Sequence, residues 1–91
     1  MNTTSDPRIE AREHINRAAA QLTVIAMEHP EYREGFVVLA RAANQPLTKP
    51  QLAQLGKHVA IAQERVAAES QEAAAGLDAA LGELRQAYQL V

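Results

Sequence analysis

Apolar residues recur at intervals of three and four along almost the whole of this 91-residue chain. This spacing places the apolar side chains on one face of a helix. The clearest run lies between residues 49 and 66, and its members are Leu52, Leu55, Val59, Ala62 and Val66. No segment alternates apolar and polar residues as a half-buried strand does. The pattern therefore predicts an all-α fold.

Prolines divide the N-terminal half into two predicted helices. Asp6 followed by Pro7 is a typical helix start, because aspartate caps free N–H groups and proline suits the first turn. An apolar face then continues to about Glu28, formed by Ala11, Ile15, Ala18, Leu22, Ile25 and Ala26. Pro30 interrupts this helix and begins a second one, over residues 30–43. We expect Asn44 to end that helix in the left-handed conformation.

A third helix is predicted to begin at Lys49. Thr48 and Gln51 match the capping box, in which two side chains satisfy each other's free backbone donors. The apolar seam that starts at Leu52 resumes after Val66 as Ala74, Leu77, Leu81, Leu84 and Tyr88. We therefore expect a long C-terminal helix over about 49–75, which either continues to 90 or bends near Gly76 and Gly82, since each glycine costs a helix about 1 kcal/mol.

The length of the chain suits one small domain. We expect residues 1–5 to be disordered and residues 6–91 to form a single helical domain. Its architecture is predicted to be a small bundle or hairpin of three to four helices, with the first two packed along the third. With aromatic residues at only 3%, the core is thin, and such chains often gain stability by association. We therefore expect a coiled-coil-like homodimer joined through Leu77, Leu81, Leu84 and Tyr88.

Composition excludes several classes of partner and site. The formal net charge of -2 gives no general attraction to nucleic acid or anionic membranes. The absence of cysteine excludes disulfides and thiolate metal sites. No apolar run reaches the roughly 18 residues of a membrane span, and the polar first residues are unlike a secretory signal. We expect a cytoplasmic protein, and the alanine- and arginine-rich composition is typical of a GC-rich bacterial or phage genome.

Catalytic and cofactor motifs are missing from the sequence. His14, His29 and His58 have no second histidine at a spacing of three to five. Glu10 and His14 share a helix face, but two residues do not provide the three or four ligands of a zinc site. No serine or threonine has a nearby Asp–His pair to activate it. We therefore expect a non-catalytic protein with no cofactor, metal site or small-molecule substrate.

The segment "TKPQLAQLG", Thr48 to Gly56, resembles the first half of a helix-turn-helix. The resemblance implies a DNA-binding transcriptional regulator that uses residues 48–66. That family normally places three residues between the Leu-Ala pair and the turn glycine, whereas only Gln54 and Leu55 stand there in this chain. Few phosphate-neutralising cations lie nearby, although they supply most of the affinity for DNA. Helix packing is therefore the preferred interpretation of this segment, and DNA binding is the alternative.

Four apolar residues lie outside the predicted core faces, on either side of the His29–Pro30 corner. They are Val24 and Met27 on the first helix and Val37 and Val38 on the second, with Arg33 and Arg41 beside them. If they cluster, they form an apolar patch rimmed by charge, which is typical of protein-binding sites. The alternative is that another helix covers them. The preferred hypothesis is a module that binds and modulates another protein, as an inhibitor, adaptor or chaperone.

Overall fold

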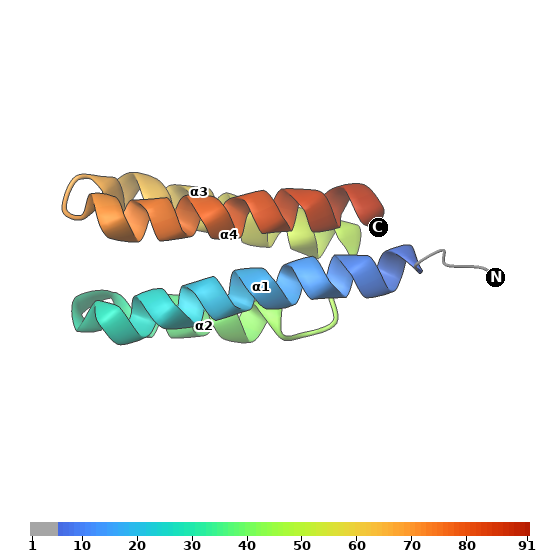
Figure 1. The fold of residues 1–91 in the computed structure, drawn as a ribbon, viewed down its shortest axis with the longest axis horizontal. Coiled ribbons are helices and arrows are strands. Elements are labelled where there is room, and N and C mark those ends of the chain that lie inside the picture. Colours follow the sequence, from blue (N-terminus) through green and yellow to red (C-terminus); the bar gives the residue numbers. More distant parts are fainter. Residues whose placement is uncertain (1–5) are drawn as a thin grey trace.

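A computed structural model describes residues 6–91, which form four α-helices. The helices are α1 (Pro7–Glu28), α2 (Arg33–Ala43), α3 (Lys49–Ala67) and α4 (Gln71–Leu90), with a short 3-10 helix, η1 (Pro30–Tyr32), before α2. Successive helices run in opposite directions (Figure 1). This arrangement confirms the predicted small all-α bundle. The predicted disorder of residues 1–5 lies outside the described residues.

Side-chain caps fix the first turns of α1 and α3 as predicted. The Asp6 carboxylate accepts a hydrogen bond from the Arg8 N–H at 2.9 Å. At α3, Thr48 Oγ1 accepts from the Gln51 N–H at 3.4 Å, and Gln51 Oε1 accepts from the Thr48 N–H at 2.9 Å. These bonds satisfy backbone donors that have no partner within the helix. Local sequence alone therefore sets where both helices begin.

The predicted long helix over about 49–75 is wrong, because α3 ends at Ala67 and α4 begins at Gln71. Ser70 separates them in an extended conformation, and its hydroxyl accepts from the Ala73 N–H at 3.2 Å. Gly76 and Gly82, where a bend was expected, lie inside α4. Folding into two antiparallel helices buries both apolar faces against each other, and this burial outweighs the helix propensity of the linking residues.

The end of α2 falls at Ala43 as predicted, but Asn44 does not adopt the left-handed conformation. Its φ is -85° and its ψ is -2°, which continues the right-handed turn. The Asn44 N–H donates to the carbonyls of Ala40 and Arg41, both at 3.1 Å. The last turn is thereby tightened, and these carbonyls are satisfied without a left-handed residue.

Lys49–Ala67 is one uninterrupted helix. Gly56 lies in its middle, so α3 has no turn at the position that a helix-turn-helix requires. The resemblance of "TKPQLAQLG" to that motif therefore does not extend to the geometry of this segment.

The two hairpins, α1–α2 and α3–α4, pack together mainly through α1 and α4. Of the four neighbouring helix pairs, α1 and α4 contact each other most and α2 and α3 contact each other least. The prediction that the first two helices pack along the third is therefore wrong, because α4 takes that place beside α1. The His14 Nδ1 atom lies 2.6 Å from Glu83 Oε1 and adds a polar link between these two helices.

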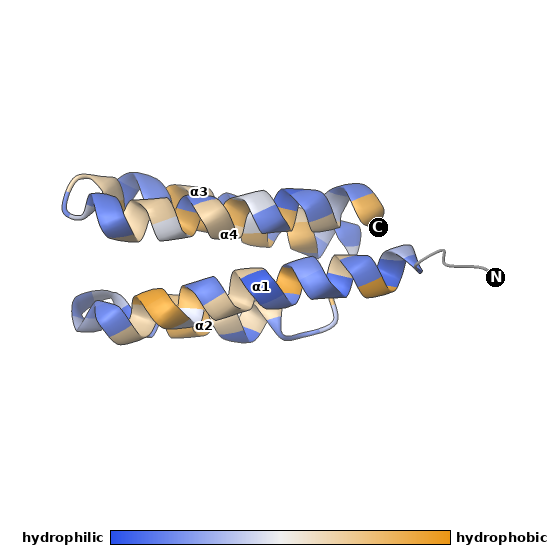
Figure 2. Ribbon diagram, in the orientation of Figure 1, coloured by the Kyte–Doolittle hydropathy of each residue, from blue (hydrophilic) through white to orange (hydrophobic). Residues whose placement is uncertain are grey.

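Among residues 6–91, twenty buried apolar residues form one continuous core, and about half of them are alanines. The largest fully buried side chains are Leu22, Leu52, Leu77, Leu84 and Val59. Each ribbon alternates hydrophobic and hydrophilic segments along its length, as expected of amphipathic helices (Figure 2). Across residues 6–91, none of the helices is both long enough and apolar enough to cross a membrane.

Candidate functional site

A groove with a volume of about 920 Å³ runs between α2 and α3. It lies along the helix pair that packs least closely. Phe36 and Val66 line it from the core, whereas Val38 on α2 and Ile61 on α3 are 63% and 41% exposed. Both helices therefore present uncovered apolar side chains to the same groove. Exposed apolar side chains that face one groove from two helices make it a candidate binding site.

Carboxylates dominate the charged part of the groove. The groove is lined by the carboxylates of Glu31, Glu34 and Glu69. The guanidinium of Arg65 and the imidazole of His58 also line it, from the α3 side. Within the described part of the chain, neither Glu34 nor Arg65 takes part in an ion pair. The groove therefore combines an apolar lining with a rim in which negative charges outnumber positive ones.

Tyr32 connects the two walls at the end of the groove near the α3–α4 turn. Its O–H donates a hydrogen bond to the Glu69 carboxylate, which follows α3. Its ring packs edge-on against Phe36, with the centroids 5.9 Å apart. The hydrogen bond to Glu69, together with partial burial and the charges of Glu69 and Glu31, raises the pKa of Tyr32 to about 12. Among residues 6–91, the Tyr32–Glu69 bond is the one side-chain hydrogen bond that crosses the groove.

Of the six residues predicted from sequence to bind a partner, only Val38 lines the groove. Val38 lines the groove, whereas Val37 is half-buried and packs against the core. Val24 and Met27 are 46% and 70% exposed on α1, and Arg33 and Arg41 are exposed on α2, but none of these four lines the groove. Binding through this set stays a prediction, and the structure brings only Val38 to the groove.

Two important groove features were missed from the sequence. Ile61 lies next to the seam residue Ala62, about 100° around the helix, so it is an apolar residue outside the core face. That is the same signal that singled out Val38, and it could have identified Ile61. The Tyr32–Glu69 hydrogen bond joins residues from different helical segments, and no local sequence pattern predicts it.

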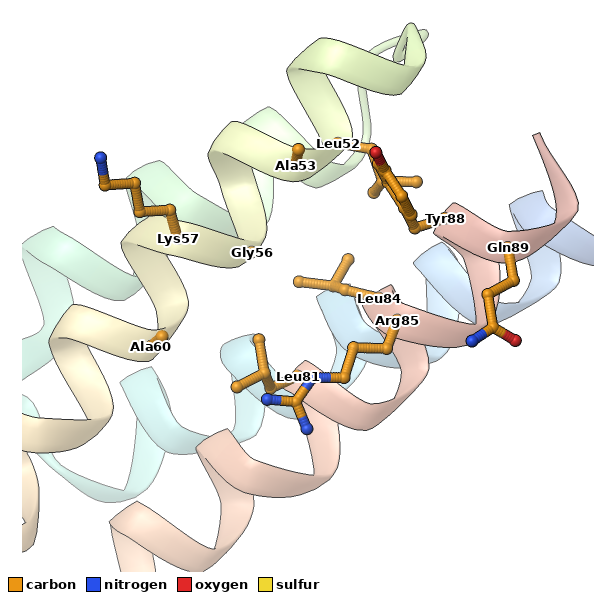
Figure 3. Close-up of a pocket in the computed structure, with 10 residues that line it drawn as sticks. All are labelled: Leu52, Ala53, Gly56, Lys57, Ala60, Leu81, Leu84, Arg85, Tyr88 and Gln89. Carbon is orange, nitrogen blue, oxygen red and sulfur yellow. The ribbon is translucent and has the colours of Figure 1, made fainter.

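A second, smaller pocket of about 420 Å³ lies between α3 and α4 near the C-terminus. Leu81, Leu84 and Tyr88, three of the residues predicted to mediate self-association, line it (Figure 3). Leu77, Leu81 and Leu84 are buried in the core of the single chain, and Tyr88 alone of the four is exposed. The Lys49 Nζ atom lies 4.6 Å from the centroid of the Tyr88 ring, a cation–π arrangement that holds this ring beside α3.

The chemistry of the larger groove suits non-covalent binding. Its side chains offer apolar contact, carboxylates and one guanidinium, and His58 Nε2 lies 3.3 Å from the Gln54 amide. Neither a known protein family, nor a curated protein, nor a solved structure is significantly similar to this chain.

Proposed function

We infer that the protein is a non-catalytic interaction module that binds a helix of another protein in the α2–α3 groove. The observation that carries this proposal is the pair of exposed apolar side chains, Val38 and Ile61, that face one groove from two helices. Burying them against a partner removes apolar surface from water, which is the main driving force of protein association. Such binding is stoichiometric, and it alters the activity, assembly or delivery of the partner.

The dimensions of the groove fit an amphipathic helix. Its α3 wall extends from His58 to Val66, which at 1.5 Å per residue is roughly 12 Å, or a little over two helical turns. A partner helix that carries apolar residues at i, i+3 or i+4, and i+7 spans about 10 Å and lies within that length. This mode of binding needs no change in the bundle, because the groove is already open.

The charges of the groove define the chemistry of the partner. Three carboxylates, those of Glu31, Glu34 and Glu69, surround the apolar lining against the single guanidinium of Arg65. A helix whose apolar stripe is flanked by Lys or Arg complements this rim, and complementary charge favours encounter and orientation. The proposed partner segment is therefore a basic amphipathic helix.

Selection from a displayed library of 20-residue helical peptides tests this proposal. We expect the enriched peptides to carry an apolar stripe with Lys or Arg beside it, and to bind the wild-type protein in a fluorescence anisotropy titration. Val38→Asp should abolish this binding without lowering the melting temperature, since Val38 is exposed. Val24→Asp is the matched control, because it introduces the same charge at an exposed helical valine outside the groove.

Two results would overturn the proposal. One is peptide binding that survives Val38→Asp but is lost in Val24→Asp, which would place the binding surface on α1. The other is tight binding to duplex DNA that weakens steeply with salt, the behaviour expected of a DNA-binding regulator.

A further inference from the structure

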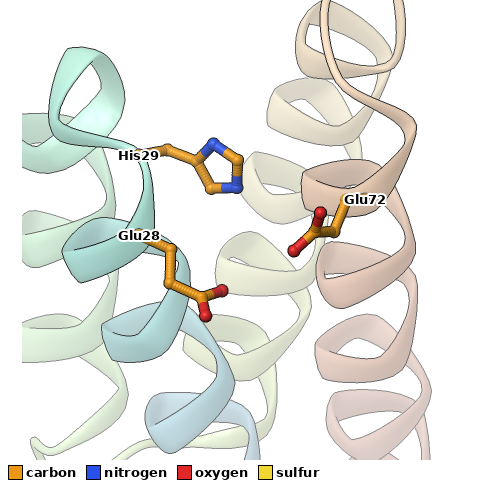
Figure 4. Close-up of side chains that lie close together, drawn as sticks. All are labelled: Glu28, His29 and Glu72. Atoms are coloured by element: carbon orange, nitrogen blue, oxygen red, sulfur yellow. The ribbon is translucent and has the colours of Figure 1, made fainter.

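Three metal-ligating side chains meet at the end of the bundle where the α1–α2 corner approaches the start of α4. They are Glu28, His29 and Glu72, and one ligand atom of each lies within 4.8 Å of the other two. Figure 4 shows the three side chains directed toward a common space between the two hairpins. Donor atoms around a tetrahedral zinc ion are about 3.3 Å apart, so small side-chain rotations bring all three within bonding distance.

The electrostatics of this cluster favour a cation. Among the residues that the structure describes, neither Glu28 nor Glu72 forms an ion pair with a lysine or arginine. The two carboxylates therefore repel each other, and of the two only Glu72 is stabilised by a helix dipole, because it lies in the first turn of α4. Glu28 is also the last residue of α1, whose final turn contains no basic residue. The negative end of the helix dipole disfavours a carboxylate there and favours a positive charge.

The imidazole of His29 is oriented as a metal-ligating histidine should be. Its Nδ1 atom lies 3.5 Å from the Glu31 carboxylate, which leaves Nε2 for a ligand on the other side of the ring. A carboxylate on the far side of the ring from the metal is common at zinc sites, where it accepts the other ring N–H. The side chain of His29 is 18% exposed, so the ring is held by its surroundings while one edge stays accessible.

We propose that Glu28, His29 and Glu72 form a binding site for a divalent transition metal of the Zn²⁺ class. His29 Nε2 and one oxygen from each carboxylate supply three ligands, and water completes the tetrahedron. One imidazole with two carboxylates suits Zn²⁺ better than Mg²⁺ or Ca²⁺, which prefer oxygen ligands alone. The ion joins the end of α1 to the start of α4 and thereby cross-links the two hairpins. Spacing along the chain gave no sign of this site, because Glu72 comes from a distant helix.

Zinc titration of the untagged full-length protein tests the site by calorimetry and by thermal unfolding. We expect one Zn²⁺ per chain and a melting temperature that rises with Zn²⁺ but not with Mg²⁺, because a ligand that binds only the folded state stabilises it. Glu72→Gln should weaken zinc binding by about 100-fold or more, given that loss of even an outer partner costs 10–100-fold. Glu64→Gln is the control, since it removes the same charge from an exposed position on α3.

The three histidines of the chain allow an independent assignment by NMR. Zinc should shift the ring nitrogen signals of His29 and leave those of His14 and His58 in place. Shifts at another histidine, zinc stabilisation that persists in Glu72→Gln, or no zinc binding by the wild-type protein would each overturn the proposal. Because the nitrogen shifts are measured on the wild-type protein, the test stands even if a variant fails to fold.

Discussion

At the scale of single residues, the Tyr32–Glu69 hydrogen bond has a measurable effect on titration. Because this bond is made by the neutral phenol, the pKa of Tyr32 rises from its ordinary 10.0 to about 12. A group whose pKa is raised by folding stabilises the folded state fully below its unfolded pKa. We therefore expect this contribution to be present up to about pH 10 and to be lost as the pH rises toward 12.

Absorbance titration of the phenolate measures this shift directly. Glu69→Gln removes the charged acceptor, so the Tyr32 transition should move down from about 12 toward 10. Tyr32→Phe identifies the transition, because it leaves Tyr88 as the only tyrosine in the chain. If the wild-type and Glu69→Gln curves coincide, the hydrogen bond does not hold in solution.

Two glycines in α4 should respond oppositely to alanine. A Cβ atom at Gly82 would meet nothing within 4 Å, whereas at Gly76 it would lie 2.9 Å from Ile25 Cδ1. Gly82→Ala should therefore stabilise the protein by about 0.5–1 kcal/mol through helix propensity. At Gly76 the same gain is opposed by overpacking against a buried side chain, which costs about 1–3 kcal/mol.

Urea denaturation of the two variants provides the comparison, and each serves as the control for the other. A higher midpoint for Gly82→Ala and a lower one for Gly76→Ala are expected. Equal stabilisation by both would show that α1 and α4 are not in close contact at Gly76. The sequence alone predicts the same effect at both positions, because only the fold brings Ile25 to one of them.

At the scale of helices, local signals predicted most boundaries and failed at one turn. The starts of α1 and α3 follow from Asp6 and from the Thr48–Gln51 capping box, whose side chains act on the adjacent backbone. The turn between α3 and α4 contains neither proline nor glycine, and alanine and glutamate surround it. Ser70 caps α4, but it can do so only once α4 folds back against α3. Long-range burial decides that turn, and no local pattern reveals it.

Replacing the Ser70 cap tests the break between α3 and α4. Ser70→Ala leaves the Ala73 N–H without its side-chain acceptor and should reduce the free energy of unfolding by about 1 kcal/mol. For a domain of this size that corresponds to a fall of about 4–8 °C in melting temperature. Helix content measured by circular dichroism should stay constant.

Thr48→Ala provides the matched comparison for that experiment. It removes a cap that the capping box predicts from local sequence, so the two losses should be similar. If Ser70→Ala instead raises both the helix content and the melting temperature, α3 and α4 form one continuous helix in solution and the four-helix arrangement fails.

At the scale of the whole molecule, the pairing of α1 with α4 explains why the groove exists. Apolar periodicity shows which face of a helix is buried, but it does not show against which helix. Once α4 packs on α1, the short α2 is left beside α3 with few contacts, and Val38 and Ile61 remain uncovered. The sequence thus predicted an exposed valine on α2 and carried the same signal at Ile61, but only the fold shows that these two residues face one groove.

The burial of the C-terminal apolar residues shows which of them belong to the core of one chain and which could contact a second copy. Leu77 is fully buried in the single chain, whereas Tyr88 is 40% exposed. Leu77→Ala should lower the free energy of unfolding by about 2–5 kcal/mol, because it removes buried methyl groups and leaves a cavity. The loss should be the same at protein concentrations tenfold apart, since the contacts of Leu77 lie within one chain.

Tyr88→Ala is the corresponding test of the predicted homodimer. If two copies associate through the C-terminal segment, this variant shifts sedimentation toward the monomer and removes any rise of melting temperature with concentration. Leu77→Ala does not test dimerisation in this way, because losing this buried side chain also destabilises the single chain. A concentration-dependent loss of stability in Leu77→Ala would mean that the leucine packs against a second copy, and the assignment of α4 to the core of one chain would then be wrong.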